Sequence, residues 1–352
     1  MRNIIKPSPT EAEREFAENG RPLITIGVTT YNRPQMLREC VASILSQSYP
    51  NIEIIIGNDF VEQPVTFDSL GVHNDPRVRI VNHPQNIGAF NNNRYVLREA
   101  HGDWFTWLAD DDLMHPEYLQ IAYKVLSKCE VTSVFANYVA EPDPYGIFPA
   151  KLHTVIPQIL SGREFIDKYT SRSIRTVGNS GVFRRELFKH LGNVQASITG
   201  GRFYWDTFMP IFAATFGNVA YVDLDLIFLR THASSHSVGP ESPIKAYSCA
   251  QEDFIVEFEQ RCKHFLEADE YERQLMNMLK WFAADGWHLI CRKHASVPRR
   301  LSSFYQYLID TIVPRLPVRF KGAFGLFAST MAVGDSVRYV ASRVLRAMKA
   351  WS

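Results

Sequence analysis

Apolar residues form short continuous runs that alternate with amphipathic stretches through the first part of the chain. The runs 23–31 and 52–59 are rich in β-branched residues and predict two buried strands. Between them Pro34 begins a predicted helix, because proline is well tolerated in a first helical turn. Its apolar face follows helical spacing: Leu37, Cys40, Val41, Ile44 and Leu45. Strand, helix and strand in this order form a βαβ unit, which implies parallel strands and a right-handed crossover.

The same alternation continues with further predicted elements. Strands are expected at 78–82, 104–108, 131–139 and 220–229, and helices at 91–100 and 116–128. The pattern is weak between 140 and 200, and becomes helical after about residue 240, most clearly at 251–266 and 271–290. These elements predict an α/β fold with a doubly wound, mostly parallel central sheet flanked by helices, and a helical C-terminal extension.

This pattern also predicts the domain organisation. An N-terminal extension covers 1–20, and an α/β domain covers 21–240, with a regular first half, 21–140, and a less regular second half, 141–240. A basic helical region covers 241–352.

Composition and cysteine usage indicate an ordinary globular protein in a reducing compartment. Hydrophobic residues make up 46% and charged residues 21% of the chain. The five cysteines are scattered without CxxC spacing, which excludes a disulfide framework of the usual kind. We find neither a signal-peptide pattern at the start nor an apolar run of roughly 18 residues, so we expect a cytoplasmic protein.

Charge is distributed unevenly along the chain. From Arg292 onward there are 11 Lys/Arg against two acidic residues, a charge of +9 that leaves −8 for the remainder of a chain of net charge +1. A predicted amphipathic helix near the end carries a stripe of Val337, Val340, Val344 and Met348 between basic residues. Such a helix can lie on an anionic membrane surface or pack on the preceding domain, and a peripheral location on the inner face of the membrane is compatible with it. No nucleic-acid-binding module is recognised, so no nucleic-acid partner is expected.

Three consecutive carboxylates, Asp110, Asp111 and Asp112, follow the predicted strand 104–108. At the end of a buried strand they repel one another and require either solvent or a cation. A hard divalent ion, Mg²⁺ or Mn²⁺, satisfies three carboxylates and leaves positions for phosphate oxygens. The alternative is a solvated turn that caps the helix beginning near Pro116.

Several short motifs stand in a fixed order around this acidic run. They are Thr30-Tyr31-Asn32-Arg33, Ser43-Ile44 with Gln47, Tyr49 and Glu53, Asn58-Asp59, Asn86-Ile87-Gly88, and Ala109-Asp110-Asp111-Asp112. As a set, over residues 21–235, they resemble the family-2 glycosyltransferases of GT-A fold. The resemblance implies that 21–240 is a GT-A catalytic domain, with 21–140 as its nucleotide-binding half and 141–240 as its acceptor-binding half.

The resemblance implies a role for each matching residue. The nucleotide-sugar would contact Thr30, Tyr31, Arg33, Asp59, Asn86 and Asp110. The metal would be held by Asp111, Asp112 and His232, and the catalytic base would be Asp206 at the start of an apolar helix. Many family members have an aspartate where this chain has Ala109, so which of the three aspartates binds the metal directly stays open, with Asp111 the first choice. The segment 226–237 is similar to the closing Y-R-x-H-x-x-S motif, which places Arg230 or His232 near the diphosphate or metal and a lid at Ser234–His236.

The resemblance implies an inverting glycosyltransferase of hexosyltransferase type in cell-surface polysaccharide synthesis. The donor would be a nucleotide diphosphate sugar, with UDP-sugars favoured, and the acceptor a glycan or a lipid-linked glycan. Two alternatives remain. Ala109 is compatible with a non-catalytic scaffold of the same fold. A sugar nucleotidyltransferase would need a glycine-rich loop after the first strand, and no glycine follows Val28 in that loop.

Overall fold

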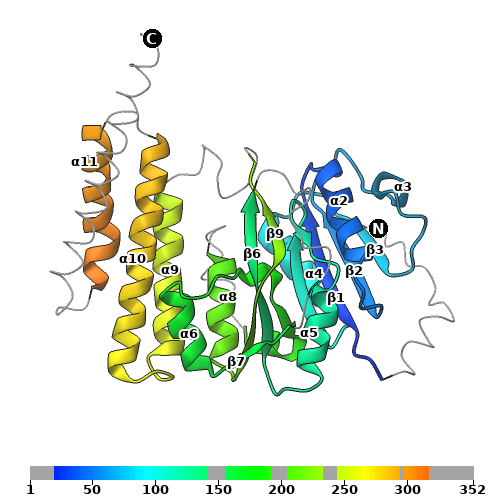
Figure 1. The fold of residues 1–352 in the computed structure, drawn as a ribbon. Coiled ribbons are helices and arrows are strands. Elements are labelled where there is room, and N and C mark those ends of the chain that lie inside the picture. The colour runs from blue at the N-terminus through cyan, green and yellow to red at the C-terminus, as the bar shows by residue number, and fades with distance from the viewer. Residues whose placement is uncertain are drawn as a thin grey trace, which may run out of the picture. The chain divides into compact units, whose positions relative to one another are not determined.

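The computed structural model describes residues 20–141, 152, 155–191, 204–232, 244–293 and 297–316. By compactness the chain divides into two units, Met1–Ala233 and Ser234–Ser352. The first unit is an α/β structure built on one sheet, and the described part of the second unit is helical (Figure 1). The predicted fold class is confirmed.

The described strands of the first unit form one nine-stranded sheet of order β3-β2-β1-β4-β8-β6-β9-β5, with β7 paired to β9. Their bounds are β1 Ile24–Thr30, β2 Ile52–Asn58, β3 Val78–Asn82, β4 Trp104–Ala109, β5 Leu113–Met114, β6 Ser133–Glu141, β7 Gln158–Leu160, β8 Val182–Arg184 and β9 Val219–Arg230. The long ladders, β3-β2-β1-β4 and β6-β9, are parallel, whereas the antiparallel pairings are two or three residues long. Because β1 lies between β2 and β4 in parallel register, the ends of all three strands meet at one edge.

Helices of the first unit cover both faces of this sheet. Their bounds are α2 Pro34–Leu45, α3 Phe67–Leu70, α4 Ala89–Arg98, α5 Tyr118–Leu126, α6 Gly162–Thr170 and α8 Trp205–Ala214, with short turns η1 Gly178–Ser180 and η2 Arg185–His190. Ile26 and Val28 belong to the buried cluster that also contains the apolar faces of α2 and α5. On the opposite face, a Cβ added at Gly57 would lie 2.0 Å from Asn92 Oδ1, so only glycine lets α4 pack this closely on β2.

The predicted elements of residues 21–140 are present with ends shifted by a few residues. The described residues of 140–200, where the pattern was weak, include the strands β7 and β8, which are too short for periodicity to reveal. They also include α6, which begins with a capping box in which Ser161 and Glu164 bond each other's backbone N–H groups. The S-x-x-E spacing at this point was a readable helix start that the hydrophobic pattern missed.

The second unit contains α9 Ile244–Cys262, α10 Ala268–Lys293 and α11 Val297–Tyr307, followed by the short turns η3 Leu308–Ile312 and η4 Val313–Arg315. Its core is aromatic: Phe254, Phe258, Phe282, Trp287 and Phe304 are buried. Within the described residues, no helix is long and apolar enough to cross a bilayer. The predicted amphipathic helix at 337–348, the lid at Ser234–His236 and residues 1–19 lie outside the described residues.

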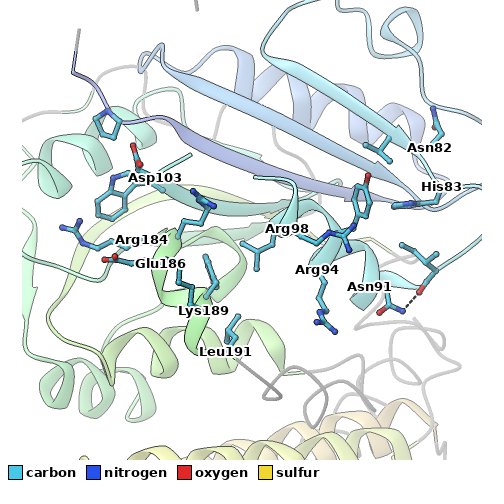
Figure 2. A pocket seen from close by; sticks show the side chains of 18 of the residues that line it. Asn82, His83, Asn91, Arg94, Arg98, Asp103, Arg184, Glu186, Lys189 and Leu191 are labelled. Carbon is cyan, nitrogen blue, oxygen red and sulfur yellow. Dashed lines mark hydrogen bonds between the residues drawn. The ribbon is translucent and has the colours of Figure 1, made fainter. Parts of the chain in front are cut away.

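A groove of about 1270 Å³ runs along the outer side of α4 in the first unit (Figure 2). The β3–α4 loop forms one end, and Asp103 and Trp104 at the start of β4 form the other. The turn η2 provides the wall opposite α4. This groove involves different residues from the acidic strand end.

Candidate active site

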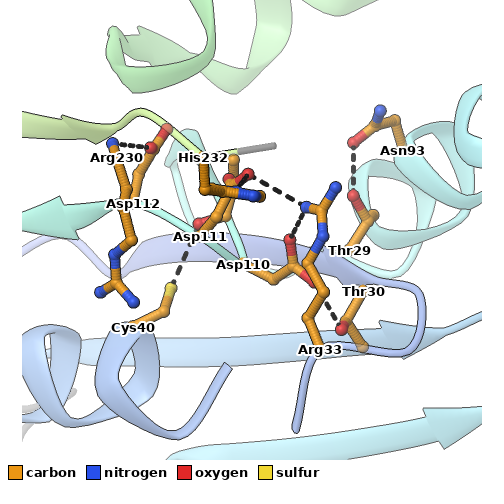
Figure 3. A network of polar contacts seen from close by, with 11 residues as sticks. Thr29, Thr30, Arg33, Cys40, Asn93, Asp110, Asp111, Asp112, Arg230 and His232 are labelled. Carbon is orange, nitrogen blue, oxygen red and sulfur yellow. Dashed lines mark hydrogen bonds and ion pairs between the residues drawn. The ribbon is translucent and has the colours of Figure 1, made fainter. Parts of the chain in front are cut away.

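The acidic run lies where β4 ends, next to the ends of β1 and β2 (Figure 3). Asp110 is 3% exposed and Asp111 is 9% exposed, which is unusual for two adjacent carboxylates. A solvated cap would leave these side chains in water. The alternative interpretation of the run as an exposed turn is therefore wrong for Asp110 and Asp111.

Asp110 is bound by the loop that follows β1. Thr30 Oγ1 donates to Asp110 Oδ2 at 2.6 Å, and Arg33 Nη1 lies 2.8 Å from Asp110 Oδ1. Asn32 takes a left-handed conformation with φ of 55°, which turns the chain toward Arg33 and the start of α2. Burial raises the pKa of Asp110 above its usual value, and the neighbouring Arg33 counteracts this only in part.

Asp111 joins two segments that are far apart in the sequence. Its Oδ2 atom lies 3.0 Å from Arg33 Nη1 and 2.9 Å from His232 Nε2. His232 follows the end of β9, and the antiparallel pairing of β9 with β5, which comes directly after Asp112, brings it to the acidic run. Three predicted site residues, Arg33, Asp111 and His232, are thereby in direct contact.

Asp112 is oriented differently from the other two. Its Oδ1 atom accepts a hydrogen bond from the backbone N–H of Arg230 at 3.0 Å. The guanidinium of Arg230 is not directed at the acidic run but lies 2.8 Å from Glu39 Oε2 of α2. Burial of the carboxyl group, followed by repulsion from Asp111, raises the pKa of Asp112 well above its usual value. Sequence reasoning missed Glu39, which carries no motif signal.

Asp59 follows β2 at the same sheet edge and is 3% exposed. Its two carboxylate oxygens accept the backbone N–H groups of Ile87 and Gly88, each at 2.7 Å. Asn86 Oδ1 also accepts the Gly88 N–H, at 2.9 Å. Asp59 thus shapes the loop between β3 and α4, and direct contact of Asp59 or Asn86 with a nucleotide stays a prediction.

Tyr31 lies at the mouth of this edge with 52% of its surface exposed. Its ring packs edge-on against Phe60, with ring centroids 5.2 Å apart. An exposed aromatic ring held in place by a second ring can receive a flat ligand such as a nucleotide base. This role stays a prediction.

Asp206 is the second residue of α8. The preceding Tyr204 has a φ of 67°, a conformation that aromatic residues rarely adopt and that is often found near functional sites. Trp205 packs edge-on against Trp107 of β4, with ring centroids 6.0 Å apart, which links the start of α8 to the strand that leads to the aspartates. Asp206 is partly exposed, but protein surrounds its carboxyl group. This burial raises the pKa of Asp206. Among the described residues, Asp206 makes no hydrogen bond or ion pair with the acidic run, so its role as base stays a prediction.

Within the described residues, no group of three or more His, Cys, Asp or Glu side chains is arranged to hold a metal ion. Asp111 and His232, however, present a carboxylate and an imidazole to each other at 2.9 Å. Two protein ligands suit an ion that takes its remaining ligands from water and substrate phosphates, as Mg²⁺ commonly does. The residues present therefore fit a metal shared with a diphosphate better than a metal enclosed by protein alone.

Comparison with known proteins gives consistent results for this region. Residues 25–192 match the family model described as Glycosyl transferase family 2. An uncharacterized glycosyltransferase of Rickettsia bellii is 30% identical over 119 residues, which cover 33% of this chain and 17% of that protein. The O-antigen biosynthesis protein RfbC of Myxococcus xanthus is 30% identical over 135 residues, which cover 37% of this chain and 10% of that protein. The chain thus spans only a small part of the length of these relatives.

A solved structure gives the same fold. Residues 1–349 of S. aureus TarS, crystallised in complex with UDP-GlcNAc, align with a TM-score of 0.51 and 14% identity over 82% of this chain and 89% of that chain. Identity at this level shows the fold alone. Together with the family match and the predicted motif set, it establishes that this chain carries a family-2 glycosyltransferase domain of GT-A fold.

Proposed function

We propose that the protein is an inverting glycosyltransferase that transfers a sugar from a nucleotide diphosphate donor to a hydroxyl group of a glycan or lipid-linked acceptor. Cell-surface polysaccharide synthesis is the process that we infer, since one relative is named for O-antigen biosynthesis. A UDP-sugar is the favoured donor, and the structural neighbour with bound UDP-GlcNAc supports this choice. Function at the inner face of the membrane would suit a lipid-linked acceptor.

The observation that carries this proposal is the contact between Asp110, Asp111, Arg33 and His232 at one buried strand end. Acidic groups alone would repel a diphosphate, whereas this cluster combines carboxylates with a guanidinium and an imidazole. Arg33 can turn toward a phosphate oxygen without leaving the cluster, because its side chain is 22% exposed. Thr30 and Asp110, hydrogen-bonded to each other, would then meet the nucleoside.

A divalent ion, Mn²⁺ or Mg²⁺, would be held by Asp111 and His232, with Asp112 beside them, and would supply charge neutralisation for the leaving diphosphate. The protein's own residues perform the remaining tasks. Arg33 stabilises negative charge that develops on the phosphate oxygens, and the Tyr31 ring orients the base.

Asp206 would take the proton of the acceptor hydroxyl as its oxygen attacks the anomeric carbon. The bond to the diphosphate breaks in the same displacement, which inverts the configuration and needs no covalent intermediate. A raised pKa suits this task, because a more basic carboxylate takes a proton more readily, provided that it is ionised at the working pH.

The test compares two substitutions, Asp206→Asn and Asp111→Asn, with Asp225→Asn as a control at an exposed position of β9. Sugar transfer and metal-dependent donor binding would be measured separately, the latter by thermal shift against UDP-, GDP- and dTDP-sugars with Mn²⁺ or a chelator. Asp206→Asn should abolish transfer and keep donor binding, whereas Asp111→Asn should lose both. Equal loss of donor binding in the two variants would show that Asp206 is not the base.

A second function is favoured by one observation, the absence of a carboxylate at Ala109. A scaffold without catalytic activity could retain the cluster for structural reasons. The scaffold hypothesis predicts that no nucleotide is released from any donor sugar with either metal ion. It also predicts that nucleotide and metal together do not raise the melting temperature of the wild-type protein. Either turnover or metal-dependent nucleotide binding excludes it.

A further inference from the structure

The lining of the groove along α4 includes a cluster of basic side chains that the proposed reaction does not use. Arg94 and Arg98 come from α4, and Arg185 and Lys189 come from η2 on the opposite wall (Figure 2). Arg94 and Arg98 are four residues apart and therefore share one face of the helix. All four residues are exposed, so their charges can meet a ligand without a change in the fold.

Positive charge in this groove is not neutralised by its own carboxylates. With Arg184 the lining has five cationic residues, against two carboxylates, Asp103 and Glu186. Within the described residues, no ion pair joins a groove cation to either of these carboxylates. Arg98 does pair with a carboxylate outside the lining, since its Nη2 atom lies 3.4 Å from Glu99 Oε1, which leaves four of the five cations without an ion pair in the described residues. Clustered cations in a concave site concentrate a positive potential, which attracts an anionic ligand.

Aromatic rings hold three of these cations in place. The distances from guanidinium carbon to ring centroid are 4.4 Å for Arg184 and Trp104, 5.0 Å for Arg98 and Tyr95, and 5.6 Å for Arg94 and Phe90. Phe188 and Leu191 add apolar surface on the opposite wall. A ligand that carries both apolar sugar faces and negative groups fits such a lining.

The size of the groove indicates an extended ligand. Its volume, about 1270 Å³, exceeds the range of about 300–1,000 Å³ typical of small-molecule pockets. The end of the groove at Ile87 lies next to Asp59, one of the residues proposed to contact the nucleotide. The N–H of Ile87 donates to Asp59, and the carbonyl of Ile87 accepts from the side chain of Asn91. A chain lying in the groove would therefore end beside the residues proposed to bind the donor.

We propose that the α4 groove binds an anionic glycan chain, whose phosphate or carboxylate groups meet Arg94, Arg98 and Lys189 and whose sugar rings lie on the aromatic side chains. The inference rests on the proposed function, since such a chain would be the acceptor or the product of the transferase. A concave groove favours a single chain over a planar membrane surface.

The test measures binding of phosphorylated dextran and of neutral dextran of equal length to the full-length protein at about 0.1 M salt. The groove variant carries Arg98→Glu and Lys189→Glu, and a second variant with glutamine at both positions keeps side-chain size without reversing charge. The control carries Lys124→Glu and Lys128→Glu, two exposed lysines outside the groove. Thermal melting would verify that all variants fold.

We expect the charge reversal to weaken binding of phosphorylated dextran at least about tenfold, the glutamine variant to weaken it less, and the control to change it less than about twofold. Equal weakening in groove and control variants would overturn the proposal, as would equal binding of neutral dextran. Stronger binding of a single-stranded RNA or of vesicles with anionic lipid, lost in the groove variant, would also overturn it.

Donor hydrolysis separates this proposal from the proposed function. Groove variants should release nucleotide from the donor at the wild-type rate, because their changed residues lie outside the acidic cluster. Absence of donor turnover in every variant, with groove-dependent binding of phosphorylated dextran intact, would refute the transferase and leave the glycan site standing.

Discussion

Buried carboxylates follow two parallel strands, β2 and β4, on either side of β1 at the same sheet edge, and their surroundings differ. Asp59, after β2, has both oxygens bonded by backbone N–H groups of one loop. Asp110 and Asp111, after β4, are bonded by the side chains of Thr30, Arg33 and His232, from separate segments. Backbone donors cannot leave without unfolding the loop, whereas side chains can turn toward a ligand.

We therefore expect Asp59 to stabilise the folded loop, and Asp110 and Asp111 to interact with the substrate or metal. The sequence shows both as Asp after an apolar strand and cannot tell them apart. Identical substitutions at the two positions should therefore affect different properties of the protein.

The largest expected effect is on catalysis at the β4 end. Asp111→Asn should lower the rate of sugar transfer about a thousandfold, because it removes charge from the site proposed to hold the metal. The free energy of unfolding should change by no more than about 1 kcal/mol, since the lost pairing is offset by relief of repulsion among adjacent carboxylates. Steady-state kinetics and urea unfolding measure the two quantities.

Asp59→Asn should show the opposite behaviour. An amide offers one acceptor oxygen and directs its NH₂ group at a backbone N–H, so a buried donor loses its partner. We expect a loss of about 2–3 kcal/mol in unfolding free energy, measured by urea denaturation. Asp225→Asn is the exposed control. A stable Asp59→Asn protein without transfer activity would contradict the division between the two positions.

A smaller effect concerns a third acidic residue, Glu53 of β2, which binds the loop before β4. Thr25 Oγ1 donates to Glu53 Oε1 at 2.5 Å, and the His101 N–H donates to the same oxygen at 2.6 Å. Burial alone would raise the pKa of Glu53, but these hydrogen bonds outweigh it and hold the pKa below its usual value. The ionised group therefore stabilises the folded state.

Glu53→Gln should lower the unfolding free energy at pH 7 by about 1–2 kcal/mol. Because the folded pKa is the lower one, this stabilisation is complete above the unfolded value of about 4.3 and is lost as pH falls through the folded value. Urea unfolding at pH 7 and near pH 3 should show the difference between wild type and variant shrinking. A difference that does not depend on pH would contradict the assignment, and Glu62→Gln serves as the exposed control.

Two further motif residues, Gln47 and Tyr49, also stabilise the fold through contacts with the backbone. Gln47 donates to the carbonyl of His115 and accepts from the N–H of Leu119, which fixes the chain after the acidic run. The Tyr49 hydroxyl donates to the carbonyl of Pro22, just before β1. These motif positions were recognised from the sequence by their spacing, but their tasks became clear only from the contacts across the sheet.

The sequence by itself determined the strand–helix alternation, the family and most of the residues at the sheet edge. Local rules suffice for these, since apolar periodicity and motif order are properties of neighbouring positions. The tertiary structure alone decided that His232 meets Asp111, that Arg230 turns to Glu39, and that basic residues of α4 and η2 face one groove. Each of these pairs residues far apart in the chain, and which side chains meet depends on sheet order and register, which no single segment encodes.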